Sequence, residues 1–276
     1  MNSEDILKNT ALHLPPEFHK RRQWVLYFDR LWEMGFCEWK LREQSTIYGF
    51  LWTLLNPLLT FAVLYVVFTK WMGAKVGNYA SFLLIGVVQY GFFNLGTSYG
   101  LSSLRRRSGV IMNFILPIEI VMFSTVLSVA ISHFFEFCLM LLFIMVMGVR
   151  PTLSWIALPF IFMLLVAMIL SLSLFLSILD ARYQDFERIW GIVVSTGFFL
   201  TPIFYTMDII TPSRRRFLWL NPMTSVIDMT RQAALQGKFP NIKEFGGILI
   251  FTVLLAVFGG VFFRKQESKI ADYISV

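Results

Sequence analysis

Two ionisable residues stand inside an otherwise apolar run, and they are the first candidates for chemistry. His133 and Glu136 lie three residues apart, so a helix places both side chains on one face. An ionised glutamate near the centre of a bilayer costs about 2.5–3.5 kcal/mol, so we expect it to face protein or water and to have a partner. Two interpretations stay open. We favour a structural hydrogen bond over a proton-coupling site of a secondary transporter, because one acid gives little support for a proton relay.

The sequence contains none of the short motifs that mark soluble chemistry: no G-x-x-x-x-G-K-[ST], no H-E-x-x-H and no G-x-S-x-G. His13, His19 and His133 are too scattered for a metal cluster, and Cys37 and Cys138 lack metal-ligand spacing. We therefore expect no catalytic residue, no metal site and no disulfide. The energy source must then lie in a partner, a gradient or the substrate.

The elements that position these residues belong to a membrane protein. The chain has 276 residues, of which 57% are hydrophobic and only 15% are charged, and its mean hydropathy is +0.66. Soluble globular domains carry far more charge. The net charge of +7 fits the positive-inside bias and anionic headgroups, so we expect membrane lipids and no nucleic acid as partners.

Six charge-poor stretches are long enough to cross a hydrocarbon core of about 30 Å, since about 20 apolar residues suffice. Most of the 24 lysines and arginines then fall on the side of the two termini, which predicts that both termini are cytosolic. The predicted fold is an all-α integral membrane protein. Its transmembrane domain covers residues 44–264, with spans at about 49–70, 79–104, 118–148, 152–179, 187–206 and 245–263.

The first 41 residues precede the spans. Residues 18–41 have a basic start and carry aromatic residues at three- and four-residue steps. This pattern predicts an amphipathic helix in the headgroup plane, although a soluble helix packed on its own protein is the alternative. We expect cytosolic tails at residues 1–17 and 265–276.

The connector between the second and third spans, residues 105–116, begins with three arginines and continues into a short apolar patch before Pro117. Such a patch against the membrane face can dock into a groove of another protein. An ordinary positive-inside stop with a half-buried turn explains the same residues equally well.

The stretch around the fifth span is interrupted by Gly191, Gly197 and Pro202. Broken apolar segments are tolerated at membrane depth only where they are buried in protein or line a water-filled cavity, so we interpret this region as the outer mouth of a pathway. We expect re-entrant helices at residues 207–236, before the last span. Within them, Arg214, Arg215 and Arg216 either grip phosphate groups or contact lipid headgroups.

Several short signatures occur in order along the chain: Lys40, Arg42, Thr46, Gly49, Trp52, Pro57, Gly86, Ile111, Pro117, Arg182, Tyr183, Asp185, the TPIFY run at 201–205, and Leu220-Asn221-Pro222. In this order and with six spans, the chain resembles the membrane (permease) subunit of bacterial polysaccharide ABC exporters, the Wzm, TarG and KpsM type that moves O-antigen, capsule or teichoic acid. The sequence departs from the expected pattern at Glu43, Asn113 and Gln184, which bears on details of partner contact.

The resemblance implies a homodimer joined to two copies of a separate ATPase subunit that carries the ATP and Mg. It implies an undecaprenyl-linked polysaccharide as substrate and the bacterial cytoplasmic (inner) membrane as location. Residues 18–41 become the interface helix. The implied ATPase-coupling residues are Arg105, Arg106, Arg107, Val110, Ile111, Phe114 and Leu116. The implied cytosolic gate or partner contacts are Lys40, Arg42, Arg182, Tyr183 and Asp185.

A glycan that slides through a membrane needs weak contacts at many sites, as ions do in channels, because tight bonds would prevent its release. Aromatic faces supply such contacts. We predict that a subset of these aromatic residues lines the passage: Trp52, Phe61, Tyr65, Phe198, Phe199, Phe204 and Tyr205. The alternative is that these aromatic side chains face the lipid and serve only as apolar bulk or as part of the interfacial aromatic belts. Rival functions are an ABC exporter subunit for a small lipid or drug, a gradient-driven transporter, and a membrane-embedded glycosyl- or acyltransferase.

Overall fold

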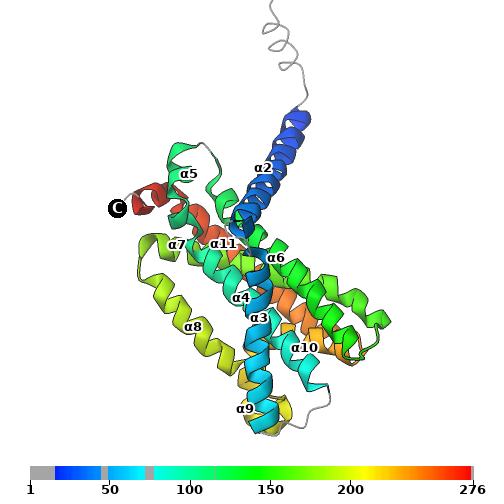
Figure 1. The fold of residues 1–276 in the computed structure, drawn as a ribbon. Helices are drawn as coiled ribbons and strands as arrows, with labels where there is room; N and C mark the ends of the chain where they lie inside the picture. The colour runs from blue at the N-terminus through cyan, green and yellow to red at the C-terminus, as the bar shows by residue number, and fades with distance from the viewer. Residues whose placement is uncertain (1–15, 45–48, 72–77, 115, 275–276) are drawn as a thin grey trace, which may run out of the picture.

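The computed structural model describes residues 16–44, 49–71, 78–114 and 116–274, and their regular structure is helical throughout (Figure 1). The helices run in the order α2 (Pro16–Gln44), α3 (Gly49–Val66) with a π-helical turn η1 (Val67–Trp71), α4 (Tyr79–Arg106), α5 (Ser108–Asn113), α6 (Ile118–Val146), η2 (Leu153–Ile156), α7 (Ala157–Arg182), α8 (Phe186–Leu200), η3 (Met207–Ile209), α9 (Pro212–Trp219), α10 (Pro222–Leu235) and α11 (Ile242–Ile274).

Among the described residues, five helical stretches are long and apolar enough to cross a membrane: Leu51–Lys70, Tyr79–Arg106, Ile118–Val146, Leu153–Arg182 and Ile242–Ile274. The chain is therefore an all-α, multi-pass membrane protein, in agreement with the predicted fold class. The number of crossings and the re-entrant character of residues 207–236 stay predictions.

The predicted fifth span, residues 187–206, differs from the helix that forms there. Helix α8 has 15 residues and at 1.5 Å per residue reaches about 22 Å, which is short of a hydrocarbon core of about 30 Å. The helix ends early because Pro202 disfavours helical geometry in the preceding residue, and Thr201 is accordingly extended. A sixth crossing needs the segment after α8 as well.

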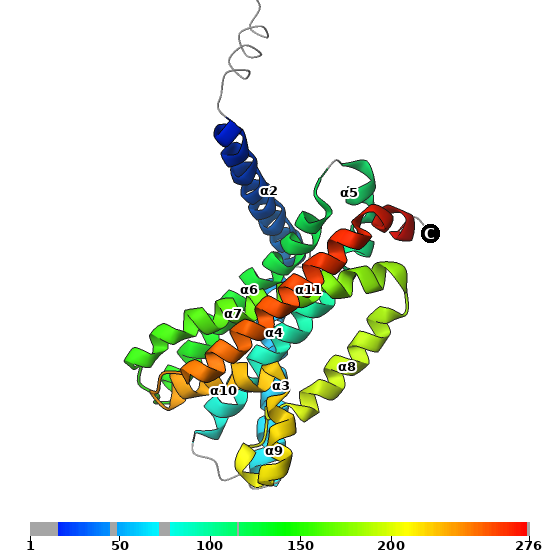
Figure 2. The ribbon, with the colours of Figure 1, turned by 180° about the vertical axis from the view of Figure 1, so that it is seen from behind.

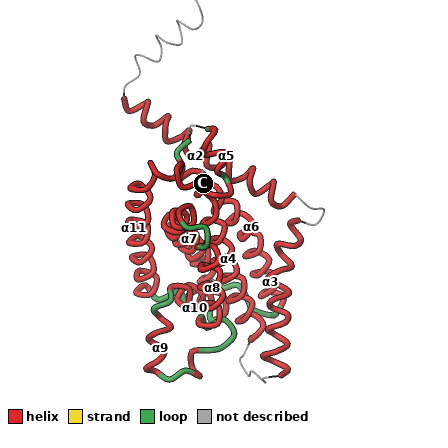
Figure 3. Tube along the Cα trace, turned by 90° about the vertical axis from the view of Figure 1, so that its left-hand side faces the viewer, coloured by secondary structure: helices red, strands yellow, loops and turns green. Residues whose placement is uncertain are grey.

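Helices α4 and α7 form the centre of the bundle. Helix α6 covers α4, and α11 packs along α7 on the other side (Figures 2 and 3). Helices α3 and α8 stand at the edge, where much of their apolar surface is exposed. The C-terminal half of α2 packs on α6, and its N-terminal half extends away from the bundle (Figure 1). Whether α2 lies in the headgroup plane stays a prediction.

Small residues allow the two central helices to approach closely, as is common in membrane bundles. A Cβ on Gly100 of α4 would lie only 2.6 Å from Cβ of Ser173 on α7. A Cβ on Gly259 of α11 would lie 2.8 Å from the carbonyl oxygen of Ser171. The positions of α4 and α11 against α7 therefore depend on glycine at these two sites.

Gly100→Val is expected to destabilise the protein by about 1–3 kcal/mol, because the added atoms overpack the contact with α7. Gly91 provides a matched control on the same helix, since a Cβ there would meet no heavy atom within 4 Å. Thermal unfolding of both valine variants in detergent measures the difference. Equal melting temperatures would contradict the packing argument.

Candidate functional site

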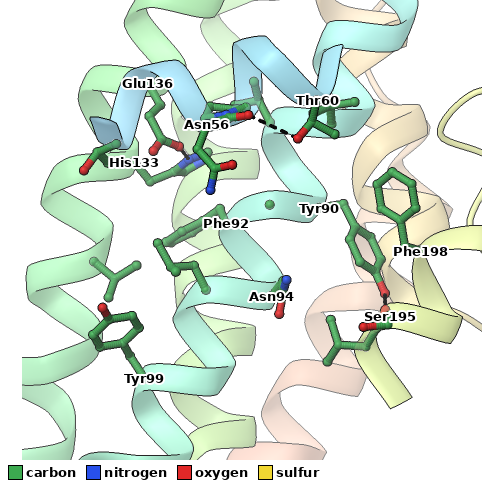
Figure 4. A pocket seen from close by; sticks show the side chains of 18 of the residues that line it. Asn56, Thr60, Tyr90, Phe92, Asn94, Tyr99, His133, Glu136, Ser195 and Phe198 are labelled. Atoms are coloured by element: carbon green, nitrogen blue, oxygen red, sulfur yellow. Dashed lines mark hydrogen bonds and ion pairs between the residues drawn. The ribbon is translucent and has the colours of Figure 1, made fainter. Parts of the chain in front are cut away.

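A cleft with a volume of about 620 Å³ lies between α3, α4, α6 and α8 (Figure 4). Its lining is mixed: polar side chains from three helices point into it, among them Asn56 of α3, Asn94 of α4 and Ser195 of α8. Aromatic side chains lie beside them, including Tyr90, whose hydroxyl donates a hydrogen bond of 2.7 Å to the carbonyl oxygen of Val194. The cleft therefore offers both hydrogen-bonding groups and flat apolar faces.

His133 and Glu136 also reach this cleft. The His133 Nδ1 and a Glu136 carboxylate oxygen are 3.1 Å apart, and the buried imidazole packs against the rings of Phe92 and Phe162 at ring distances of 4.0 and 5.7 Å. The Nε2 atom of His133 has no hydrogen-bond partner in the described part of the chain. A proton relay would need a continuation at this atom, and the choice between a structural hydrogen bond and a proton-coupling site stays a prediction.

A polar network around the end of α2 borders the cleft through Arg42 and Thr53. Arg42 Nη2 donates to Ser132 Oγ at 2.6 Å and to the carbonyl oxygen of Ser128 at 3.0 Å. The buried carboxylate of Glu43 accepts from Ser132 at 2.7 Å and from Thr53 at 2.9 Å. Glu43, which departs from the expected family pattern, thus ties α2 to α6 and α3.

The structure separates the seven predicted passage aromatics into three groups. The first group lines the cleft: Trp52, Phe198 and Phe199. The second packs on other aromatic rings: Phe61 on Phe143 at 5.7 Å, Tyr65 on Tyr79 at 6.3 Å, and Phe204 on Phe68 at 4.8 Å. Tyr205 lines a different pocket. That some of these residues line a passage stays a prediction, now concentrated on the first group.

The basic connector is joined to the bundle by ion pairs. Arg105 contacts the fully buried Asp180 of α7 through two bonds of 3.1 and 3.3 Å, and it also pairs with Glu187 of α8. Arg106 Nη2 lies 3.4 Å from the same Glu187 carboxylate. The end of α4 is thereby attached to the α7–α8 turn, so that a displacement of one requires a response of the other.

The third connector arginine joins a different element. Arg107 forms an ion pair of 3.1 Å with Glu38 of α2, and Thr125 of α6 donates to the same carboxylate at 3.1 Å. Burial raises the pKa of the Glu38 carboxyl above its ordinary value, while the Arg107 guanidinium acts in the opposite direction. The connector therefore contacts both α2 and the α7–α8 turn.

Helix α5 carries the remaining predicted coupling residues. Ile111 packs against the core, whereas Phe114, just past the end of the helix, is 63% exposed. Val110 and Leu116 are half-buried. Helix α5 has no fully buried residue. It is a surface helix that contacts α11 and the end of α4.

The predicted gate residues occupy two places. Lys40 is exposed and Arg42 faces the cleft, both near the end of α2. The other three lie at the α7–α8 turn, where Arg182 lies over the rings of Tyr183 and Tyr273 at 5.2 and 6.0 Å. Asp185 pairs with Arg188 at 3.2 Å on the surface, where an ion pair contributes little to stability.

At the opposite end of α4, two signatures of the sequence, Gly86 and the TPIFY run, meet around Arg231 of α10. This guanidinium is 4% exposed and donates to the carbonyl oxygens of Phe82, Pro202 and Ile203 at 2.7–3.2 Å. A Cβ on Gly86 would lie 2.9 Å from Arg231 Nη2, so the glycine makes room for the side chain. We call this set of contacts the Arg231 clamp.

Two further bonds hold the same TPIFY run. Asn221 Nδ2 donates to Thr201 Oγ1 at 2.8 Å, and the Tyr79 hydroxyl donates to the carbonyl oxygen of Phe204 at 2.8 Å. The nearby Arg215 donates to the carbonyl oxygens of Ile210 and Asp208 at 2.9 and 3.2 Å. Arg216 is exposed, and the side chain of Arg214 lies outside the described ones. A phosphate contact by these arginines stays a prediction.

One protein-family profile matches the part of the chain that forms the cleft, the connector and the Arg231 clamp. The sequence profile described as ABC-2 type transporter matches residues 30–235. The chain belongs to the ABC-2 type transporter family. No strand and no group of metal-binding side chains occurs in the described residues of this permease.

The relatives of this ABC-2 permease are named as an O-antigen export permease and a polysialic acid transport protein. It is 27% identical over 248 residues to an O-antigen export system permease protein, RfbA, of Klebsiella pneumoniae, covering 87% of this chain and 95% of the relative. The RfbA protein of Myxococcus xanthus is 24% identical over 239 residues, 86% and 92% of the two chains. The polysialic acid transport protein KpsM of Escherichia coli is 20% identical over 236 residues, 82% and 91% of the two chains. The resemblance to polysaccharide-exporter permeases is thus confirmed.

Sequence reasoning missed several partners in this ABC-2 permease. Asp180 and Glu187 pair with Arg105, and Glu38 pairs with Arg107, yet each carboxylate is at least 69 residues away in sequence. Arg231 was missed because a lone arginine in a mixed polar helix is most often solvated. The available signal was the set of acidic and basic residues close to the ends of the spans. Each of them needs an ion-pair partner if it is buried, so the sequence could have been searched for such partners.

Proposed function

We propose that this ABC-2 permease exports a lipid-linked polysaccharide across the bacterial inner membrane, driven by a separate ATPase subunit that binds ATP and Mg. The observation that carries the proposal is the cleft of about 620 Å³, with amide, hydroxyl and aromatic groups side by side. A polymer of sugars presents hydroxyls and apolar C–H faces, so weak contacts of both kinds suit its passage. An undecaprenyl-type lipid would anchor it.

A homodimer would complete the passage. The edge helices α3 and α8 expose large apolar side chains beside the cleft, among them Trp52, Val63, Ile192 and Phe199 at 50–70% exposure. Two copies facing each other across these helices would turn two open clefts into one enclosed conduit. The 15 residues of α8 support this, because a helix too short to cross the hydrocarbon core alone is better shielded by protein than by lipid.

The ATPase would bind at the connector. Helix α5 and the C-terminal end of α11 lie at the same end of the bundle, and α2 projects from that end (Figure 1). This arrangement supports cytosolic termini. The exposed Met112 and Phe114 offer apolar anchors for a groove in the partner. Closure of the ATPase dimer on ATP would displace α5, and the ion pairs of Arg105 and Arg107 would carry that displacement to α7, α8 and α2.

A deletion strain tests the function. Removing the gene in its own bacterium should abolish the surface polysaccharide while lipid-linked chains accumulate on the cytosolic side, measured by glycan blotting of intact cells and of opened spheroplasts. The tagged permease should purify with a Walker-motif ATPase.

Trp52→Ala together with Phe199→Ala should lower surface glycan at normal protein level, with the exposed Phe160→Ala as control, since Phe160 lies outside the cleft lining. Unchanged surface glycan in the deletion strain would refute the proposal.

A further inference from the structure

A second pocket lies at the end of α4 that is opposite the connector. It has a volume of about 510 Å³, within the range of about 300–1,000 Å³ in which proteins bind small molecules. The start of α4, the segment after the TPIFY run, and helices α9 and α10 enclose it. Its lining includes Asn78, Tyr205, Asp208, Trp219, Asp228, Arg231 and Gln236.

The lining combines flat aromatic faces with groups that donate and groups that accept hydrogen bonds. Tyr205 and Trp219 supply the rings, and Trp219 is 39% exposed. Asp228 accepts one bond from Gln232 at 2.8 Å through Oδ2, and its Oδ1 accepts none from the described residues. Asn78 and Gln236 add exposed amide groups at the rim. Unused hydrogen-bonding capacity thus surrounds an aromatic platform.

The buried guanidinium of Arg231 adds one more free donor. A guanidinium has five N–H groups, and four hydrogen bonds to backbone carbonyls are made here, two of them from Nη2 and one from Nη1. One N–H on Nη1 therefore has no partner in the described part of the chain. A buried polar group without a partner is costly, and Arg231 lines the pocket, so a ligand oxygen within reach of Nη1 would be favoured.

The charges of the pocket select against an anion. Two guanidiniums, of Arg215 and Arg231, are balanced by two carboxylates, of Asp208 and Asp228. A phosphate would gain no net attraction and would approach two carboxylates. A neutral polyhydroxyl ring can donate to the carboxylates, accept from the amide and guanidinium groups, and lay its apolar C–H face on Trp219 or Tyr205.

We propose that this pocket binds a neutral pyranose unit of the transported polymer, a step that rests on the proposed export function. The site lies near the end of α4 far from the connector. It would hold one sugar unit weakly as the polysaccharide leaves the permease. This binding would oppose movement of the polysaccharide back towards the cytosol between two cycles of ATP hydrolysis. Its specificity would come from two residues that contact the same sugar ring. Trp219 would stack on the C–H face of the ring, and Asp228 would accept hydrogen bonds from its hydroxyl groups.

The experiment uses the full-length permease in lipid nanodiscs and saturation-transfer NMR with three probes: methyl glucoside, methyl N-acetylglucosaminide and inorganic pyrophosphate. Both glycosides or one of them should bind, and pyrophosphate should not compete. Trp219→Ala and Asp228→Asn should each weaken glycoside binding about tenfold, the order expected for loss of a ring face or of a hydrogen bond to a charged group. Phe217→Ala is the matched control, because Phe217 is 73% exposed on the same helix and lies outside the pocket lining.

Three outcomes overturn the proposal: neither glycoside binds, pyrophosphate displaces the glycoside, or Phe217→Ala weakens binding as much as Trp219→Ala. Melting temperatures within a few degrees of the native protein show that the variants are folded. If Trp219→Ala does not fold, Asp228→Asn alone tests the site. The deletion strain separates the two claims. Loss of surface glycan without glycoside binding removes the sugar site and leaves the export function standing.

Discussion

Arg105→Met is expected to cost about 3–5 kcal/mol of folding free energy and to abolish export, because it leaves Asp180 buried without its partner. Asp180 is 0% exposed, and its two hydrogen bonds in the described structure both come from Arg105. The opposite change, Asp180→Leu, should cost less, since Arg105 is 38% exposed and keeps its pair with Glu187. The two single variants therefore test whether loss of Arg105 costs more folding free energy than loss of Asp180.

The double variant Arg105→Met with Asp180→Leu separates stability from coupling. Replacing both members of a buried pair by apolar residues is often neutral, so thermal unfolding should return close to the native value. Surface glycan should stay low at normal protein level, because the connector is no longer tied to α7. Arg106→Met is the control for stability: this pair is largely exposed and contributes about 0–1 kcal/mol. Full export by the double variant would show that the pair has no coupling role.

Arg231→Met is the second large effect, with an expected loss of about 2–4 kcal/mol and of export. The carbonyl oxygens of Pro202 and Ile203 lose their donor, at about 1–3 kcal/mol for each buried unsatisfied group. Relief from burying a guanidinium offsets part of this, although the ring of Phe82, 3.4 Å away, already stabilises the cation. The cost of two unsatisfied carbonyl groups therefore exceeds the relief.

Thermal unfolding in detergent measures the cost of Arg231→Met. Arg150→Met is the matched control, because Arg150 is exposed, and a surface substitution of this kind changes stability by about 0.5 kcal/mol or less. A melting temperature for Arg231→Met equal to that of Arg150→Met would refute the clamp. Arg231→Lys should remain impaired, since three donors on one nitrogen cannot reach carbonyls from two separate segments.

Much of the fold followed from local pattern. Long apolar runs identify helices whatever they contact, and the spacing of His133 and Glu136 already placed both on one face. The end of α8 could have been predicted as well, since Pro202 restricts Thr201 directly. The sequence prediction extended the helix to residue 206 because hydropathy does not register backbone geometry.

The contacts that build the sites did not follow from local pattern, because they join distant segments. Gly86, the TPIFY run and Asn221 were recognisable as separate signatures, but nothing in their spacing says that Arg231 contacts the first two or that Asn221 bonds to Thr201 of the run. Likewise, Arg105 looked like one of three equivalent basic residues. Only the packing of α4 against α7 distinguishes it, by placing Asp180 within reach.

Helix α4 has a mechanical consequence that follows from where its neighbours touch it. Gly100 presses against Ser173 five residues from Arg105 and 18 residues from Phe82, distances of about 7 and 27 Å along the axis. Helix α4 has no proline inside it, and it is held at two levels, by the glycine contact with α7 and by the bonds from Arg231 to Phe82. A displacement of α4 near Arg105 would therefore load the Gly100 contact and the Arg231 clamp together, so that the two ends of the bundle are joined through one continuous helix.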